Sequence, residues 1–563
     1  DLTRSRIGTR KACFVMGVNE GVIPSLNESA GLLTDDERTS LESLGMPLAP
    51  TAKIGLFREQ FYIYMAMLRF SHKLYLSYTT TDEGGKASRP SHILTMVHKI
   101  LPETSTYDIS EVYKNKQYGS TPAVAYEHYL SLMQSGVKAD KAIENWLLGH
   151  SPWSGKLEKA LLARTEQLLP KQLAPESNNE LYGLKLNNSV SRLEQFSGCP
   201  FSHFMTYGLN ARERESYEIT MPHLGMIFHR VIELFSKRLK QRELDWSDVT
   251  DNLRIKWIDE LMSKVLDDEA YTVFFDNQRN RHRITRLKKM VDRALWTISW
   301  QIVQGDFRPL DAEWRFDGNE HALKSINLSL EDQHKMSLRG TIDRVDHHRI
   351  SGMDYVTVVD YKSSTHDFDV NHLYAGLQLQ LIVYLNAACE IKEADYGQVL
   401  PAGVFYFKVD DPFVSGRKVL TQEACDNEIL GKMRLNGLVV DDHKVIEALD
   451  RSFAKKSKVI PISRKTDGTL AKASKTLSDE DFDVLRQFTT MKVRALGNEI
   501  MDGHIEAKPY KDKKGTACDY CGYISVCQFD PKLPGYAYRE VAEEDQEEVL
   551  KRILQEVNDQ TVV

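Results

Sequence analysis

The stretch "SLRGTIDRVDHHRISGMDYVTVVDYKSS" (residues 337–364) decides the fold of this chain. Two runs rich in β-branched residues flank "HHRISGM", in which Ser351–Gly352 forms a suitable two-residue turn. The pattern therefore predicts an antiparallel hairpin. A turn at this point places Asp343 directly opposite Asp360, and the period of two along a strand places Asp360 and Lys362 on one face.

Two opposed carboxylates indicate a metal site. Directly opposed Cβ atoms lie roughly 4.5–5.5 Å apart, and two carboxylates there repel by about 3–4 kcal/mol at an effective dielectric near 20. A divalent cation removes this repulsion, and oxygen ligands suit Mg²⁺ or Mn²⁺. Lys362 could then orient a water nucleophile or stabilise charge on a phosphate. The alternative is a surface hairpin whose carboxylates pair with nearby Arg339, Arg344 or Lys362.

A histidine upstream of the hairpin is a further candidate ligand. The spacing of apolar residues predicts a helix over "LGMIFHRVIELFSKRL" (224–239). His229 lies at the edge of the apolar face, one turn before Glu233. Such a histidine is either structural or, beside a carboxylate pair that needs another ligand, a metal ligand.

Bulk properties describe an ordinary globular chain with more than one domain. It has 563 residues, of which 42% are hydrophobic and 27% charged. No apolar run reaches about 18 residues and no signal-peptide pattern is present, so we expect no membrane segment. Seven cysteines, an odd number, do not suggest a secreted disulfide framework, which favours the cytoplasm. Because the net charge is −7, any nucleic-acid site must be a local patch.

Four segments in order resemble the motifs of the RecB-type nuclease domain, a member of the PD-(D/E)xK superfamily. They are "GMIFHRVIE" (225–233), "LRGTIDRVD" (338–346), "VVDYKSS" (358–364) and "QLQLIVY" (378–384). The resemblance implies an α/β nuclease fold and a catalytic metal, Mg²⁺ or Mn²⁺. It assigns the metal to His229, Asp343, Asp360 and the backbone carbonyl of Tyr361, the catalytic lysine to Lys362, and a supporting QxxxY element to Gln380 and Tyr384. Glu313, in "DAEWRF" (311–316), falls where the family often has an acidic residue.

The cysteines of "CDYCGYISVC" (518–527) form an incomplete ligand set, C-x2-C-x5-C. Thiolate spacing alone does not distinguish a structural Cys₄ zinc site from an iron–sulfur cluster. Some members of the RecB-like group carry one cysteine before the nuclease core and three after it, which together hold a [4Fe–4S] cluster. The resemblance thus implies a cluster held by Cys199, Cys518, Cys521 and Cys527. The other three cysteines (Cys13, Cys389 and Cys425) are expected to be small buried apolar residues.

The N-terminal segment resembles the second half of a superfamily 1 helicase core. "ACFVMGVNEGVIP" (12–24) and "FREQFYIYMAMLRFSHKLYLSY" (57–78) are similar to motifs V and VI of the UvrD/RecB type, and Arg69 matches the arginine that reaches the nucleotide γ-phosphate. The second motif is degraded, and no G-x-x-x-x-G-K-[ST] phosphate loop occurs. We expect a RecA-like 2A segment that is not a working motor. Because the chain starts directly at a strand-like run, we also expect a piece of a longer protein.

The predicted architecture is therefore α/β and multidomain. It comprises a helicase-like segment (1–95), a mostly helical connecting region (96–185), a RecB-type nuclease domain (186–535) and an acidic C-terminal helix (536–563). Together these parts resemble the smaller subunit in the AddAB family of bacterial helicase–nucleases. The resemblance implies a heterodimer with an AddA-type helicase–nuclease subunit, acting on DNA double-strand ends and single strands. It further implies resection of breaks for recombination, cutting of the 5′-terminated strand and a part in recognising Chi.

Two other functions remain open from the sequence. A non-catalytic DNA-binding scaffold would keep the cluster and lose the nuclease; the intact site motifs argue against it, and the degraded helicase motif argues for it. A stand-alone Cas4-like nuclease leaves the helicase-like segment unexplained. Residues 451–475 carry eight Lys or Arg against one Asp. They either follow a phosphate backbone or form a solvated hairpin that turns at "TDGT" (466–469).

Overall fold

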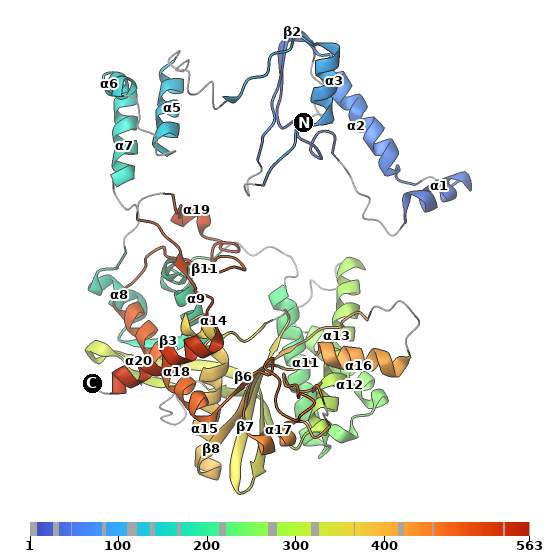
Figure 1. Cartoon of the computed structure of the whole chain (residues 1–563), viewed down its shortest axis with the longest axis vertical. Coiled ribbons are helices and arrows are strands. Elements are labelled where there is room, and N and C mark those ends of the chain that lie inside the picture. Colours follow the sequence, from blue (N-terminus) through green and yellow to red (C-terminus); the bar gives the residue numbers. More distant parts are fainter. Residues whose placement is uncertain are drawn as a thin grey trace. The chain divides into compact units, whose positions relative to one another are not determined.

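The structure is a computed structural model that describes most of the chain in two compact units, Asp1–Ser154 and Gly155–Val563 (Figure 1). The described residues are 8–25, 33–46, 48–81, 86–109, 121–134, 141–165, 171–212, 221–267, 278–316, 326–364, 366–414, 421–452, 455–532 and 535–561. Within these residues, no helix is long and apolar enough to cross a membrane. The finer division into four segments stays a prediction.

The first unit contains a parallel strand pair. β1 (Arg10–Val15) pairs with β2 (Phe70–Leu76), and α1 (Asp35–Ser43) and α2 (Ala52–Met67) lie between them in the chain. Parallel neighbours need a crossover connection, which these helices supply. The predicted strands and helix are thus confirmed, with ends displaced by a few residues. Its core is small and formed by Val15, Val18, Ile63 and Ile93.

The connecting region is mostly helical where it is described. It holds α3 (His92–Ile100), α5 (Pro122–Gln134), α6 (Lys141–Leu148), α7 (Trp153–Thr165) and α8 (Pro175–Tyr182). Of these, α8 is tied to the second unit, because the Asn178 amide donates to the carbonyl oxygens of Ile500 and Met501.

An eight-stranded mixed sheet forms the centre of the second unit. Its main path runs β10–β9–β8–β7–β6–β3, and β4 and β5 also pair with β6. The strands are β3 (Lys185–Ser189), β4 (Arg308–Phe316), β5 (Asn327–Ser329), β6 (Lys335–Ile350), β7 (Met353–Lys362), β8 (Val399–Lys408), β9 (Asn436–Val440) and β10 (Thr476–Leu477).

The predicted hairpin is β6 and β7. Their antiparallel register runs without a shift from the pair Ile350–Met353 to the pair Arg344–Val359, so Asp343 and Asp360 follow next on the two strands. Ser351 and Gly352 both have positive φ, 51° and 91°, as in a two-residue type I′ turn. The predicted turn and register are confirmed.

The spacing of apolar residues predicts one helix over 372–388, but the segment after β7 departs from this prediction. It forms two helices, α14 (Val370–Tyr374) and α15 (Gln380–Tyr396). Between them Gly376 has φ of 78°, and a Cβ there would lie 2.6 Å from the hydroxyl of Ser197. A glycine in this left-handed conformation ends the first helix, and close contact with the neighbouring helix keeps the break in place.

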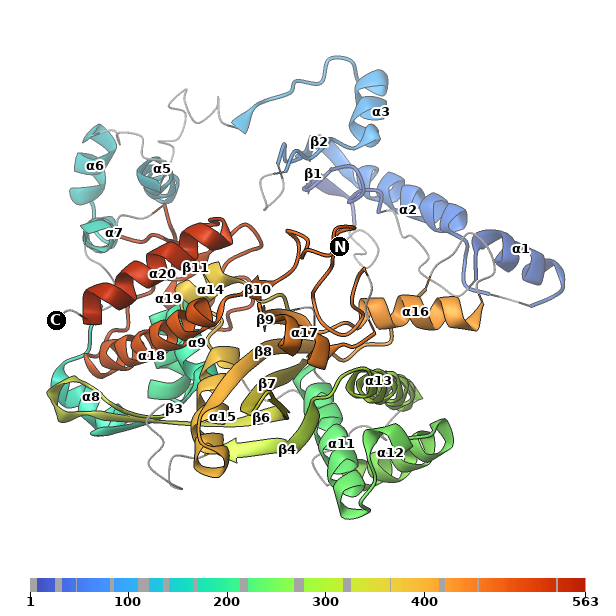
Figure 2. The ribbon, with the colours of Figure 1, turned by 60° about the horizontal axis from the view of Figure 1, so that its bottom comes forward.

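Helices pack around this sheet in two groups (Figure 2). α15 packs on β7 and β8, α18 (Asp479–Met501) packs on α15, and α20 (Gln546–Thr561), the predicted acidic helix, packs on α18. α11 (Met221–Gln241), α12 (Asp251–Leu266) and α13 (Gln278–Gln304) pack on one another, and α11 contacts β4. The smaller helices are α9 (Val190–Gly198), α10 (Pro200–His203), α16 (Gln422–Lys432), α17 (His443–Leu449) and α19 (Ile524–Cys527).

Candidate nuclease site and cysteine cluster

Asp343, near the middle of β6, joins the hairpin to α11. Its Oδ1 lies 3.1 Å from Nδ1 of His229, and its Oδ2 accepts a 2.6 Å hydrogen bond from the backbone N–H of Tyr361. α11 buries its apolar side, which includes Phe228 and Ile232, and this packing holds His229 beside Asp343. The structure therefore brings together His229, Asp343 and Tyr361, as the sequence motifs predict.

Asp360 is the centre of a second set of contacts at the end of β7. Lys362 Nζ lies 2.7 Å from Asp360 Oδ2 and donates a 2.9 Å hydrogen bond to Gln380 Oε1. Gln380 Nε2 donates to Asp360 Oδ1 at 2.9 Å and to the hydroxyl of Tyr384 at 3.2 Å. The QxxxY element thus forms one network with the aspartate and lysine of the hairpin.

Burial makes the carboxylate of Asp360 electrostatically costly. Only 3% of the residue is exposed. Burial and the charge of Asp343 raise the pKa of Asp360 to about 6, although Lys362 and His229 act in the opposite direction. Its Oδ2 is buried and lies 2.7 Å from the Lys362 ammonium, and its Oδ1 accepts from Gln380. A carboxylate oxygen in this state fits a cation ligand.

As the side chains stand, no three His, Cys, Asp or Glu residues in the described part of the chain group closely enough to hold a metal ion. The metal assignment of His229, Asp343, Asp360 and the Tyr361 carbonyl therefore stays a prediction. Glu313 belongs to β4, and its side chain lies outside the described part of the structure.

Glu194 is a site residue that the sequence motifs did not reveal. It lies on α9, and its Oε1 accepts hydrogen bonds from the backbone N–H groups of Leu379 at 2.7 Å and Gln380 at 3.0 Å. Burial raises the pKa of Glu194 to about 7, although the two backbone hydrogen bonds lower it. The available signal was a lone acidic residue in the amphipathic stretch "VSRLEQFSG" (190–198) that leads to Cys199.

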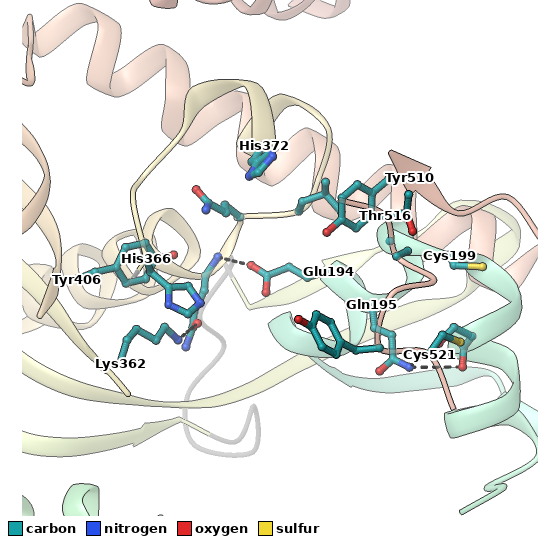
Figure 3. A pocket seen from close by; sticks show the side chains of 17 residues that line it. Glu194, Gln195, Cys199, Lys362, His366, His372, Tyr406, Tyr510, Thr516 and Cys521 are labelled. Atoms are coloured by element: carbon teal, nitrogen blue, oxygen red, sulfur yellow. Dashed lines mark hydrogen bonds between the residues drawn. The ribbon is translucent and has the colours of Figure 1, made fainter. Parts of the chain in front are cut away.

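A cavity of about 510 Å³ adjoins these residues. Lys362, Gln380 and Glu194 line one part of it, and Cys199 and Cys521 line another (Figure 3). Aromatic and polar side chains from several elements complete the wall, among them His366, His372, Tyr406, Tyr510 and Thr516. The nuclease motifs and the cysteines therefore open onto one space.

The four predicted cysteines converge, although three come from the far end of the chain. Cys199 lies between α9 and α10, and Cys527 ends α19. All four cysteines line one small cavity, together with apolar residues such as Phe201 and Phe529. Burial, together with the neighbouring Cys199, Cys521 and Cys527, raises the pKa of Cys518 to about 11. That these cysteines bind a metal group, and which one, stays a prediction.

The remaining cysteines are predicted to be small buried apolar residues. Cys389 on α15 is fully buried, as predicted. Cys13 and Cys425 are only partly buried, so the prediction of buried apolar residues is wrong for these two. Cys13 lies on a two-stranded sheet with little cover, and Cys425 lies in the first turn of α16.

Direct hydrogen bonds also tie the ends of this domain together. The Tyr523 hydroxyl donates to the carbonyl oxygen of Ala211 at 2.8 Å and accepts from the hydroxyl of Thr206 at 3.1 Å. The N–H of Phe201 donates to the carbonyl oxygen of Glu506 at 3.2 Å. The segment with the three late cysteines is thus docked on the segment around Cys199 by protein contacts alone.

Two other predicted features are the basic run 451–475 and Arg69. Residues 455–475 include a hairpin at "TDGT", where the N–H of Lys465 donates to Thr469 and Gly468 has φ of 84°. Lys455, Lys456, Lys465 and Lys472 are exposed there, which suits either a solvated hairpin or phosphate contact. Arg69 is exposed between α2 and β2 in the first unit, and its nucleotide role stays a prediction.

Comparison with known families agrees with this geometry. The PD-(D/E)XK nuclease superfamily matches residues 187–528, which contain the hairpin, Glu194 and the cysteines. The chain therefore belongs to the PD-(D/E)XK nuclease superfamily.

Over its whole length the chain is similar to ATP-dependent helicase/deoxyribonuclease subunits of the AddB type, which confirms the predicted resemblance to the AddAB family. It is 32% identical to the protein of Alkaliphilus oremlandii over 99% of this chain and 49% of that protein. It is 33% identical to that of Clostridium kluyveri over 99% of this chain and 50% of the relative. The chain thus spans about half the length of these relatives.

Proposed function

We propose that this chain hydrolyses phosphodiester bonds in DNA with Mg²⁺ or Mn²⁺, as the nuclease part of a two-subunit helicase–nuclease. The observation that carries the proposal is the joint placement of Asp343, Asp360 and Lys362 on one hairpin, with His229 in contact with Asp343. The name of the relatives, which are called helicase/deoxyribonuclease subunits, supports it.

Each side chain has a role that its contacts support. His229, Asp343, Asp360 and the Tyr361 carbonyl would hold the metal, which when bound supplies a Lewis acid for the phosphate and a water of lowered pKa. Lys362, at the mouth of the cavity, orients the attacking water and stabilises charge on the phosphate. Gln380 holds Lys362 and Asp360 in place through one hydrogen bond to each.

The wider setting of the activity is also part of the proposal. An AddA-type subunit would unwind double-strand ends, while this chain cuts the 5′-terminated strand and its helicase-like segment contributes to Chi recognition. The product would be resected DNA for recombinational repair. A cytoplasmic location belongs to this proposal, because free thiolate ligands persist in a reducing compartment.

For the cysteine cluster we propose a [4Fe–4S] centre rather than zinc. Four cysteines around one apolar-walled cavity supply the ligand number that either group needs. A cluster is larger than a single ion and needs more widely spaced sulfur atoms. The choice of the iron–sulfur centre rests on the resemblance to RecB-like nucleases, in which one cysteine before the core and three after it hold such a cluster.

The second candidate function is a non-catalytic DNA-binding scaffold within the same kind of complex. One observation favours it: the motif around Arg69 is degraded from its usual pattern, so a neighbouring activity has already been lost. The intact network between Lys362, Asp360 and Gln380 argues against a scaffold. Burying charged groups costs free energy, and a non-catalytic protein would gain no activity in return.

A single substitution separates the two functions. In the complete complex, Asp360→Ala should lower cutting of the 5′-ended strand at least about 100-fold while unwinding by the partner continues. The matched control is Asp559→Ala, an exposed position on α20, which should cut normally. Chelation by EDTA should stop cutting by the unaltered complex, and added Mg²⁺ should restore it. Persistent cutting by Asp360→Ala would make this site assignment wrong.

A further inference from the structure

α15, which carries the QxxxY element, begins without a cap of its own. A helix starts with N–H groups that have no partner within the helix, and a side chain at the N-cap position usually satisfies one of them. The N-cap residue here is Leu379, whose side chain makes no capping hydrogen bond. Yet Gln380, the first residue of this helix, must present its side chain to Lys362 and Asp360.

Glu194 supplies the missing cap from a different helix. Its Oε1 accepts from the N–H groups of both Leu379 and Gln380, at 2.7 and 3.0 Å. A negative carboxylate at this end is also favoured by the helix dipole. The same carboxylate lines the cavity beside Lys362, so it lies between the helix start and the space where the substrate would bind.

A second contact holds α9 against the loop before α15. The Ser197 hydroxyl donates to the carbonyl oxygen of Ala375 at 2.6 Å, and Arg539 donates to the same carbonyl at 3.2 Å. Gly376 lies so close to Ser197 that no side chain fits between them. The loop between α14 and α15 is therefore fixed to α9 at both of its ends, near Ala375 and at Leu379.

We propose that Glu194 is a positioning residue for the nuclease reaction, acting through Gln380 on Lys362 and Asp360. The expected effect on activity rests on the proposed function, whereas the expected effect on backbone hydrogen exchange does not. Glu194 fixes the backbone at the start of α15, and this fixes where the amide of Gln380 can reach. Gln380 then holds the ammonium of Lys362 and one oxygen of Asp360.

The structural readout is hydrogen exchange at two backbone amides in the full chain. Glu194→Ala removes their acceptor, so the amides of Leu379 and Gln380 should exchange about 10-fold faster or more. Glu194→Gln keeps an acceptor oxygen and should restore most of the protection. The control Ser191→Ala, an exposed position on the same helix, should leave both amides unchanged. Unchanged exchange in Glu194→Ala would overturn the inference, whether or not the protein cuts DNA.

The kinetic readout is a double-mutant cycle on single-stranded DNA with Mg²⁺ in the complete complex. Glu194→Ala should lower kcat about 10- to 100-fold, because a small displacement of a catalytic group is costly, and should leave KM within about twofold. In a Gln380→Ala background the same substitution should cost less than about threefold. Equal losses in both backgrounds, or a loss confined to KM, would overturn the positioning role. If the unaltered complex fails to cut, the proposed function is wrong and the exchange experiment still decides the role of Glu194.

Discussion

At the scale of single residues, the site is built around carboxylates that the protein buries at a cost. Asp360 is almost fully buried, and its pKa of about 6 results from burial and from Asp343. Lys362, 2.7 Å from Oδ2, and Gln380, which donates to Oδ1, offset this cost without removing it, since the pKa stays raised. A bound cation would offset the charge of Asp343, which is one cause of this raised pKa.

Glu194 provides a test of how the free energy of unfolding depends on pH. Its pKa of about 7 in the folded protein lies above the ordinary value of 4.5 because of burial. The folded chain therefore holds this proton more tightly than the unfolded chain does. The free energy of unfolding contributed by Glu194 should be highest below pH about 4.5, fall as the pH rises to about 7, and then stay constant.

The measurement compares the unaltered chain with Glu194→Gln, which cannot titrate. Between pH 5 and pH 8, the unaltered chain should lose up to about 3 kcal/mol more unfolding free energy than the variant. Urea denaturation of the nuclease domain at each pH gives both values. A parallel pH dependence in the two proteins would show that Glu194 does not titrate in this range.

At the scale of elements, the hairpin shows what sequence patterns can predict. The turn at Ser351–Gly352 and the alternation along both strands are local, so one register satisfies them, and the structure has that register. His229 could be placed on its helix for the same reason. Gln380 and Tyr384 depended on the family resemblance, because Gln380 contacts Asp360 across from a helix to a strand and Tyr384 contacts only Gln380 in this network.

The break between α14 and α15 shows where local patterns fail. Residues 372–388 have helical spacing, but the loop at Gly376 is set by α9, which lies far upstream in the chain. The same tertiary contact brings Glu194 to the start of α15. Neither feature has a signature within a short window of sequence, so the one missed site residue and the one wrong helix have a common cause.

Gly431 and Gly437, six positions apart, offer a matched pair of substitutions in a helix and a strand. Gly437 lies on β9, where a Cβ would sit 1.8 Å from the carbonyl oxygen of Val404 on β8. Gly437→Ala should therefore force the strands apart and destabilise the nuclease domain by at least about 3 kcal/mol. Gly431 is exposed on α16 with open space around it, so Gly431→Ala should stabilise by about 0.5–1 kcal/mol.

The test is whether the two substitutions change the stability of the fold in opposite directions. Thermal melting of the two variants beside the unaltered chain should place Gly437→Ala well below it and Gly431→Ala slightly above. Equal destabilisation by both substitutions would mean that the close approach of β8 and β9 does not exclude a side chain at position 437.

At the scale of the whole molecule, cysteines from the two ends of the nuclease domain meet. Cys199 precedes the catalytic hairpin in the chain, and Cys518, Cys521 and Cys527 follow it. Because they meet at one cavity, everything between them is a single closed loop once a metal group binds. In the chain-entropy description, closing so long a loop stabilises the folded state by about 4–5 kcal/mol, minus any strain. The hydrogen bonds of Tyr523 across the same junction show that the protein brings these ends together by itself.

The cluster prediction follows from this closure. Each of Cys199→Ala, Cys518→Ala, Cys521→Ala and Cys527→Ala removes one of four ligands, so all four should lose the centre and melt at lower temperature by a similar amount. Cys425→Ala is the control, because this half-buried cysteine lies apart from the cavity, and it should keep the centre. The measurement is visible absorbance and iron content of protein purified without oxygen, alongside thermal melting. A colourless protein that contains zinc would exclude an iron–sulfur centre. A full iron content in Cys199→Ala would instead show that the centre does not include the upstream cysteine, and the loop would then be open.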